Sequence, residues 1–422
     1  MTNKFEITKS NILNSANDGF GNLKFRAWNL FGICILIIGA FLPLPSLGQN
    51  DTSKTSQDAI YARPFINIAK TNTAIGGYVE GNTNYFAEDG VSEGFSMELR
   101  RFNIFLYSNI HSRIKFISEL EFEQGTEEIS LETALLDFEL NPALNFRAGI
   151  LLPQIGLVNA NHDSPKWEFV ERPLSSTEII PSTLSEVGFG LHGKLYQDKT
   201  IFAYDAYVVN GLQENVILND QGKTFIPAGK NPEMFGEDNN GTPMFNAKIS
   251  LANKKIGEVG LSYYGGVYNR FNLEGNIVEE KRSLHLIAFD LSTHIEKLKI
   301  QGEYVHATIQ VPNNLKEIYG TQQSGAFLEF SYPVLKRKMI GFENSVLNVN
   351  ARMERIDYNI GTMGPDNMNI GDEVSALALG VGFRPSASTV IRFNYRYHLI
   401  YDFLGNPPAH LGGFQFGIAS YF

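Results

Sequence analysis

The last twelve residues, Leu411 to Phe422, read LGGFQFGIASYF and decide the fold. Phe414, Phe416, Ile418 and Phe422 follow a two-residue period, so one face of a strand here is apolar and the other carries small or polar residues. Lipid tolerates no open sheet edge, so a closed barrel whose last strand pairs with its first and turns its apolar face outward explains this ending. The alternative is a secreted β-domain that ends on Phe by chance.

This stretch resembles the C-terminal strand of bacterial outer-membrane barrels, whose terminal Phe is recognised by the barrel-assembly machinery. The resemblance implies that Phe422 is an assembly signal and that the assembly machinery is a partner.

Composition narrows the class of protein. The chain has 422 residues with 39 Gly, 31 Phe and 18 Tyr, and beyond its start it has no apolar run of about 18 residues, which excludes a helical membrane protein. The formal charge is −10. Residues 1–48 hold four basic and two acidic side chains, which leaves 31 basic against 43 acidic in the remainder, or −12. Nucleic acid is therefore not an expected partner.

The start of the chain has the pattern of an export signal. Lys24 and Arg26 precede the uncharged run Leu30–Leu42 (LFGICILIIGAFL), and Pro and small residues follow it. We expect a signal peptide over 1–48, with the mature chain starting near Gln49. The rival interpretation is an inner-membrane anchor, and the long polar prefix leaves the true start of the coding sequence open.

Two more domain assignments follow. Residues 49–73 are polar and irregular and predict a short periplasmic lead without a fold of its own, and residues 74–422 predict the barrel. The one cysteine, Cys34, lies in the export signal, so the mature chain has no disulfide and no cysteine metal site.

The barrel region is a series of alternating segments. In Arg113–Glu123, apolar residues alternate with charged ones, as they would in a strand between lipid and water. Sixteen such segments are predicted, at 75–86, 97–109, 112–123, 129–141, 143–152, 186–196, 199–210, 244–253, 257–269, 281–295, 296–309, 322–333, 344–357, 373–384, 387–401 and 410–422.

The connections between these strands alternate between short and long. Short turns at one rim and long loops at the other, with an even strand count, are typical of an outer-membrane barrel and favour it over a sandwich. Two connections fit less well, a five-residue outer loop at Gln124–Glu128 and a long inner turn near Val334–Glu343. The third outer loop, 153–185, combines Pro, Trp, charges and hydroxyls, which suits a folded loop more than a disordered one. Similarity to sixteen-stranded porins, which send this loop back into the lumen, implies that it folds inward as a constriction.

Short motifs in a fixed order resemble the phosphate-selective porin O and P family. They are FRAGILLPQIG at 146–156, WEFVERPLSS at 167–176, GFGLHGKL at 188–195, YVVNG at 207–211, IQGEYVHA at 300–307, ARMERIDY at 351–358 and LGVGFRPSASTVIRFNYRYH at 379–398. The resemblance implies a sixteen-stranded passive channel, commonly a homotrimer, with a basic constriction that favours phosphate or related anions.

The phase of the strands predicts which charges face the lumen. Apolar neighbours place Arg147, Arg352, Arg392 and Arg396 inside, and the family's F-x-E-R segment brings in Arg172. With Lys166 of the same loop, these six residues form the predicted pore-lining and anion-binding set. The same phase places acids inside, namely Glu119, Glu121, Glu123, Asp137, Glu139, Glu303 and Glu329. A general pore with a transverse field is therefore the alternative to an anion filter.

No residues point to catalysis, a cofactor or a metal. His162 and Asp163 lie beside Lys166, and we interpret them as part of a solvated loop. The segment 238–240 lacks the spacing of a calcium loop, and no G-x-S-x-G occurs. Three histidines lie on predicted strands, at His285, His294 and His306, without an assignable Ser or acid partner.

The sequence thus predicts an all-β porin in the outer membrane of a Gram-negative bacterium. It would be a trimer that contacts lipid and lets small hydrophilic solutes, including phosphate, diffuse passively, which is a form of ion transport and not an enzymatic activity. The alternatives are a barrel-borne hydrolase at the outer rim and a non-conducting adhesin or receptor. The solute and the pore diameter are not determined at this level.

Overall fold

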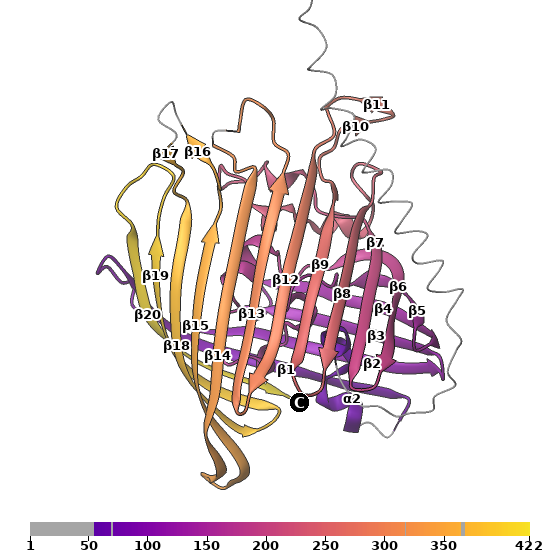
Figure 1. Cartoon of the computed structure of the whole chain (residues 1–422), viewed down its shortest axis with the longest axis vertical. Coiled ribbons are helices and arrows are strands. Elements are labelled where there is room, and N and C mark those ends of the chain that lie inside the picture. The colour runs from indigo at the N-terminus through magenta and orange to yellow at the C-terminus, as the bar shows by residue number, and fades with distance from the viewer. Residues whose placement is uncertain (1–54, 69–70, 317, 364–367) are drawn as a thin grey trace, which may run out of the picture. The chain divides into compact units, whose positions relative to one another are not determined.

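Sixteen antiparallel strands close into one barrel in the computed structural model (Figure 1). It describes residues 55–68, 71–316, 318–363 and 368–422, so the predicted signal peptide, Cys34 and the start at Gln49 lie outside the described residues. The barrel strands are β1 (Thr73–Glu88), β2 (Phe95–His111), β3 (Ile114–Glu123), β4 (Glu128–Asn141), β5 (Leu144–Leu151), β6 (Glu186–Gln197), β7 (Thr200–Val209), β8 (Met244–Asn253), β9 (Gly257–Val267), β12 (Ser283–Ile295), β13 (Leu298–Ile309), β14 (Gln322–Met339), β15 (Phe342–Asp357), β18 (Glu373–Ser386), β19 (Thr389–Ile400) and β20 (Ala409–Tyr421).

The last strand closes the barrel on the first. β20 pairs with β1 from Tyr78 opposite Tyr421 to Glu88 opposite Leu411. Phe422 continues this ladder, because its N–H donates to the Gly77 carbonyl at 3.0 Å and its carbonyl accepts from the Gly77 N–H at 3.3 Å. All sixteen predicted strands are present and the predicted closure is confirmed.

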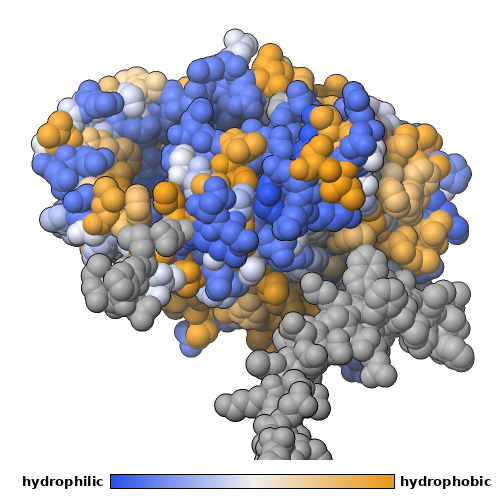
Figure 2. Space-filling view, turned by 90° about the horizontal axis from the view of Figure 1, so that it is seen from above, coloured by the Kyte–Doolittle hydropathy of each residue, from blue (hydrophilic) through white to orange (hydrophobic). Residues whose placement is uncertain are grey.

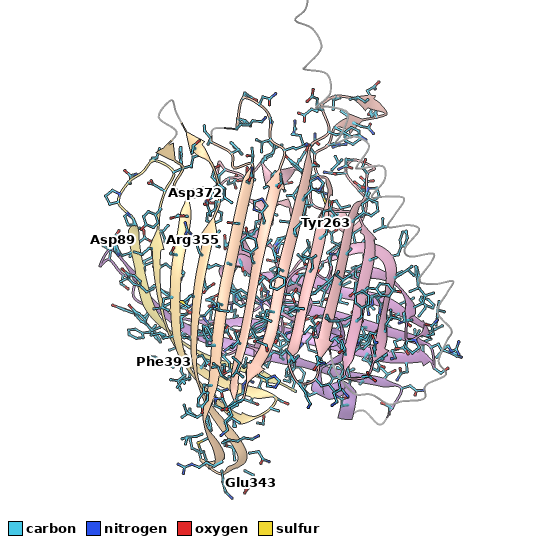
Figure 3. The ribbon with its side chains drawn as sticks, viewed as in Figure 1. Asp89, Tyr263, Glu343, Arg355, Asp372 and Phe393 are labelled. Carbon is cyan, nitrogen blue, oxygen red and sulfur yellow. The ribbon has the colours of Figure 1, made fainter. Side chains whose placement is uncertain are left out.

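Side-chain exposure follows the predicted two-residue period. Phe393 and Phe414 are 50% and 48% exposed on the outside of the barrel, where Figure 3 labels Phe393 on the wall. Their neighbours Asn394 and Gln415 are 0% and 2% exposed and face inward. The outer surface is therefore apolar over the strands and the inner surface is polar, as a barrel in lipid requires.

The two ends of the barrel differ. Long loops gather at the upper end in Figure 1 and short turns at the lower end. Seen from above, the loop end is mainly hydrophilic, with hydrophobic groups between the polar ones (Figure 2). No helix in the described part of the chain is long and apolar enough to cross a membrane. The loops contain only short elements: η2 (Asn159–Asn161), η3 (Ser164–Lys166), η4 (Ser175–Ile179), η5 (Glu214–Val216), η6 (Ile226–Gly229), η7 (Pro232–Phe235), β10 (Asn272–Leu273) with β11 (Asn276–Ile277), and β16 (Thr362–Met363) with β17 (Met368–Asn369).

The long inner turn predicted near Val334–Glu343 is wrong. β14 and β15 continue to Met339 and Phe342, and only Ile340 and Gly341 form the turn. Both turn residues have positive φ, 50° and 85°, which lets two strands reverse over two residues. The hairpin therefore extends below the other turns, with Glu343 labelled at its end (Figure 3).

The prediction of an irregular lead also differs from the structure. Ser56–Tyr61 forms the 3-10 helix η1 and Pro64–Ile68 forms the α-helix α2, just before β1 begins. Thr55 starts η1 with a capping box that includes Asp58. Composition alone did not show this order, because most of the partners of these residues are on distant strands.

Candidate functional site: the lumen and its two inner segments

The third loop, residues 152–185 between β5 and β6, lies inside the barrel, as the sequence predicted. Glu303 on β13 holds both of its ends, since one carboxylate oxygen accepts from the Leu157 N–H at 2.8 Å and the other from the hydroxyls of Ser175 and Ser176, each at 2.8 Å. Gly156, with φ +59°, enters beside this carboxylate, where a Cβ would lie 2.1 Å from Glu303 Oε2. Only glycine fits this path.

The far side of the loop is bound to the opposite wall through its backbone. The Val170 N–H donates to Asn394 Oδ1 at 2.9 Å and the Leu174 N–H to Glu354 Oε2 at 2.6 Å. Gly380 on β18 leaves space for the third loop, since a Cβ at this position would lie 3.2 Å from the Phe169 ring. Buried backbone groups need partners, and here inward side chains of the wall supply them.

Arg392 on β19 is one of these wall anchors. Its Nη1 donates to the Phe169 carbonyl at 2.7 Å, and its Nη2 donates to Ser164 Oγ at 2.9 Å and pairs with Glu80 at 3.0 Å. The side chain is 1% exposed. Arg392 faces the lumen as predicted, but both of its terminal nitrogens are bound by the loop and by a carboxylate, and only Nε has no hydrogen-bond partner among the described residues.

Arg352 and Arg396 lie on the same wall, on either side of the small residue Ala378 in the sheet register. Arg352 pairs with Glu354 at 2.9 Å and donates to the Glu171 carbonyl at 2.9 Å. Arg396 is held more loosely, since its ion pair with Glu354 is 3.7 Å long. Its Nε and Nη2 have no hydrogen-bond partner among the described residues.

The other three predicted basic residues lie elsewhere. Arg147 pairs with Asp137 at 2.7 Å, and Lys166 pairs with Asp163 at 3.0 Å. Arg172 donates to Thr183 Oγ1 at 3.0 Å and lines a separate cavity of about 380 Å³ together with Lys230. Nearby acids, a loop hydroxyl and loop carbonyls bind most of the six basic residues, and their role as a pore-lining and anion-binding set stays a prediction.

Polar atoms without a protein partner gather on one part of the inner wall. They belong to inward residues of β15, β19 and β20, and none has a hydrogen-bond partner among the described residues: Asn350 Nδ2 and Oδ1, Asn394 Nδ2, Arg396 Nε and Nη2, His398 Nε2 and Gln415 Oε1. Buried polar groups are rarely left without a partner, so ordered water at this part of the wall would supply the missing hydrogen bonds.

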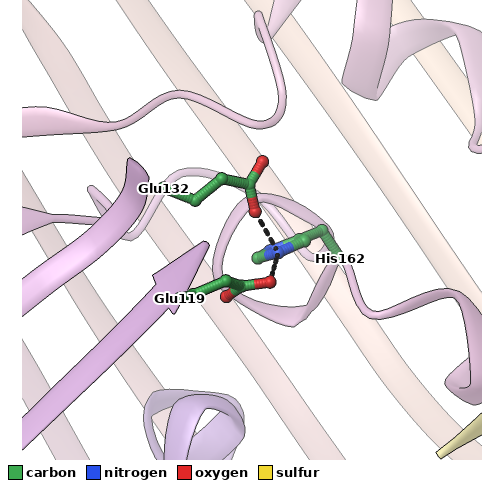
Figure 4. A group of neighbouring side chains, drawn as sticks. All are labelled: Glu119, Glu132 and His162. Atoms are coloured by element: carbon green, nitrogen blue, oxygen red, sulfur yellow. Dashed lines mark hydrogen bonds and ion pairs between the residues drawn. The ribbon is translucent and has the colours of Figure 1, made fainter. Parts of the chain in front are cut away.

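His162 is buried, which contradicts its interpretation as part of a solvated loop. Its Nδ1 lies 3.0 Å from the Asn159 carbonyl and must carry a proton, while Nε2 lies 2.9 Å from Glu132 Oε2 and 3.3 Å from Glu119 Oε1 (Figure 4). Burial lowers the pKa of His162, but the carboxylates of Glu132 and Glu119 more than reverse this and raise it to about 10.

The three side chains could also hold a divalent cation, because each offers a ligand atom and these atoms lie within 4.8 Å of one another. Arg63, however, pairs with Glu119 at 2.5 Å and already supplies positive charge there. A protonated imidazole between two carboxylates therefore fits the surroundings.

A second inner segment was missed by the sequence analysis. The N-terminal segment, Thr55–Ile68, lies in the turn-side half of the lumen, where Arg63 and Ile60 are 1% and 2% exposed. A possible signal was the sequence IYARPFI at 60–66, whose aromatic and aliphatic residues around a single Arg do not suit a solvated linker. The role of Glu303 was also missed, since only its inward direction was predicted.

Similarity to known proteins agrees with the barrel architecture. The chain matches no protein-family model. An uncharacterized protein of Aquifex aeolicus is 26% identical over 343 residues, 77% of this chain and 76% of that protein.

Solved outer-membrane proteins share the fold. The outer membrane channel DcaP of Acinetobacter baumannii has a TM-score of 0.53 at 11% identity, with 84% of this chain and 99% of that chain covered. An anion-selective porin from Comamonas acidovorans has a TM-score of 0.51 at 11% identity, covering 83% and 99%. OmpT, an outer membrane protein of Vibrio cholerae, has a TM-score of 0.50 at 12% identity, covering 84% and 99%. At such identities the likeness shows the fold alone, a β-barrel like those of these outer-membrane proteins.

Proposed function

We propose that this chain is a porin of a Gram-negative outer membrane through which small hydrophilic solutes diffuse passively. The observation that carries the proposal is the group of buried polar atoms on β15, β19 and β20 that have no partner among the described residues. A barrel with an apolar exterior and unsatisfied donors and acceptors inside suits a water-filled path.

The finer part of the proposal is a mild preference for anions, carried by Arg396. A guanidinium keeps its charge and offers a fork of donors, and Nε and Nη2 of Arg396 have no hydrogen-bond partner among the described residues. Strict phosphate selectivity is less well supported, because Glu354 and Glu171 lie beside the same wall and Arg352 is already engaged with both residues. Membership of the phosphate-selective porin O and P family stays a prediction.

Lipid, a trimeric assembly and the barrel-assembly machinery are the proposed partners. The exposed apolar rows on the strands suit lipid or a neighbouring subunit, and one solved form of OmpT is a trimer. Phe422 is 57% exposed and stacks on Phe102 at 5.9 Å, so its ring is accessible on the outside of the closing strand. Deleting Phe422 should lower the yield of folded protein, and an unchanged yield would remove its proposed role as an assembly signal.

The hydrolase alternative has one relevant contact. His285 Nε2 lies 3.0 Å from Ser283 Oγ, and Nδ1 lies 2.8 Å from the Tyr263 hydroxyl. These residues are in phase with Ile287 and Phe289, which are 53% and 48% exposed on the outside of the barrel. A Ser–His pair on the lipid side is poorly placed for hydrolysis of a soluble substrate.

Planar-bilayer conductance tests the porin proposal and also separates it from a non-conducting adhesin. We expect stable channels and a small reversal potential of anion sign in a salt gradient. The Arg396→Gln variant should lose this sign. Arg355→Gln is the matched control, because Arg355 lies on β15, faces outward and has a 65% exposed side chain. Absence of channels from folded protein would overturn the porin function, and cation preference in the native channel would overturn only the anion preference.

A further inference from the structure

The N-terminal segment crosses the turn-side half of the lumen and touches many strands. Its first residues reach β9 and its last residues reach β2. The wall contacts, in order along the segment, are Ser56 Oγ with Glu258 at 2.5 Å, Gln57 Nε2 with Asp205 at 2.8 Å, Asp58 with Lys194, the Tyr61 hydroxyl with Asp137 at 2.5 Å and the Phe65 ring stacked on Phe105 at 5.8 Å. A peptide with such contacts occupies part of the cross-section that a solute would use.

Arg63 joins this segment to both the wall and the third loop. Its Nη2 lies 2.5 Å from Glu119 Oε2 on β3, and Nη2 and Nε lie 3.0 and 3.1 Å from the two oxygens of Asp163 in the loop. The guanidinium also covers the Phe105 ring at 3.6 Å. Lys166 of the loop adds a hydrogen bond to the Ala59 carbonyl at 3.2 Å. The two inner segments are therefore bound to each other as well as to the barrel.

We propose that the N-terminal segment is a second constriction of the channel and that Arg63 is the positioning residue that couples it to the third loop. The proposal rests on the proposed porin function. In this proposal, residues that precede the first barrel strand help to set the width of the channel. Arg63 then has a role that differs from that of the predicted anion-binding residues.

The electrostatics explain why Arg63 is suited to this role. Glu119 and Asp163 are both buried, at 0% exposed, and both carboxylates face the same guanidinium. Removing one member of a buried ion pair leaves the other charge without compensation. Loss of Arg63 therefore removes the guanidinium that bridges the two carboxylates. Glu119 keeps His162 at 3.3 Å and Asp163 keeps Lys166 at 3.0 Å, but the N-terminal segment loses its attachment to both the wall and the loop, so we expect the two inner segments to loosen from each other.

Single-channel conductance of folded protein measures the constriction. We expect a variant lacking residues 55–68 to conduct severalfold more than the native channel. Arg63→Met should give an intermediate and noisy conductance, and Arg63→Lys, which keeps the charge, should stay close to native. Should Arg63→Met fail to fold, Tyr61→Phe combined with Asp58→Asn removes two other attachments and should raise the conductance. Native conductance in the deletion variant would overturn the proposal.

Thiol labelling tests the position of the segment without any current. In a Cys34→Ser background, Ile60→Cys places a thiol at a position that is 2% exposed, and Glu343→Cys places one on a 71% exposed side chain at the β14–β15 turn. A charged maleimide should modify position 60 at least about tenfold more slowly than position 343, and adding Arg63→Met should remove this protection.

The two measurements separate the two proposals. Equal labelling rates at positions 60 and 343 would overturn residence of the segment in the lumen, whatever the conductance. Protection of position 60 combined with a severalfold conductance gain on deletion supports the constriction. Protection with no current in any variant would overturn the porin function and with it the constriction, and would leave the segment as a structural closure.

Discussion

The third loop and the N-terminal segment both lie in the lumen, but the barrel holds them differently. Wall side chains bind the backbone of the loop, as Arg392 binds the Phe169 carbonyl and Asn394 binds the Val170 N–H. The N-terminal segment is attached mainly through its own side chains, as in the ion pairs of Asp58 and Arg63. The loop also has ion pairs of its own, Glu168 with Arg384 and Glu171 with Arg100, each at 2.6 Å, so the difference lies in how much of its backbone the wall binds in addition. We therefore expect the loop to be the more firmly held of the two.

The largest effect is expected for Arg392→Met, which removes a loop anchor. Glu80, which is 0% exposed, would lose Arg392 and keep Arg101 at 3.2 Å, and breaking a buried ion pair costs up to about 3–5 kcal/mol. Arg396→Met on the same strand should cost much less, because its ion pair is 3.7 Å long. Denaturant unfolding followed by heat-modifiable mobility measures both variants. Equal losses would contradict the contrast between a fixed anchor and a free guanidinium.

Glu303→Gln should come next. Three donors of the third loop end on this carboxylate, and one amide oxygen cannot satisfy all of them. Each buried donor left without an acceptor costs about 1–3 kcal/mol. The unfolding midpoint should fall, and protease sensitivity of the loop should rise. Glu343→Gln, at the exposed turn, is the control and should change neither.

A smaller, pH-dependent effect is expected at the joint between the two segments. The folded pKa of His162 is about 10, above an unfolded value of about 6.5, so the imidazolium stabilises fully below pH about 6.5 and this contribution is lost as the pH rises toward 10. Between pH 6 and pH 9 the native protein should lose about 3 kcal/mol more stability than His162→Gln. Parallel pH profiles for the two proteins would exclude a charged His162.

The smallest effect is expected for Asp58→Asn. The ion pair of Asp58 with Lys194 is partly exposed, at 26% and 13%, and pairs of this kind contribute about 0.2–1 kcal/mol. Global stability should hardly change, yet position 60 should become easier to label, and more so at low salt, where the native pair is strongest. A native labelling rate in this variant would show that the segment is held by its apolar contacts instead.

Much of the barrel could be predicted because its pattern is local. A residue's neighbours at two-residue spacing determine its face, so Arg147, Arg352, Arg392 and Arg396 were correctly placed inward, and the alternating loop lengths indicated the sixteen strands. The inward third loop was also predicted, from its position and composition. The β14–β15 hairpin was not, because pairing of two strands beyond the barrel wall leaves little trace in either strand alone.

The sequence by itself determined the barrel, its closure by Leu411–Phe422 and which charged side chains face the lumen. The reason is that the two-residue period of a strand can be seen in neighbouring residues of the sequence. Only the tertiary structure decided which charges are free. Arg392 meets Phe169 across 223 positions of sequence, and Arg63 meets Asp163 across 100. The partners of a guanidinium are thus set by distant parts of the chain, and only the tertiary structure distinguishes Arg392, whose two terminal nitrogens are bound, from Arg396, whose Nε and Nη2 have no hydrogen-bond partner among the described residues.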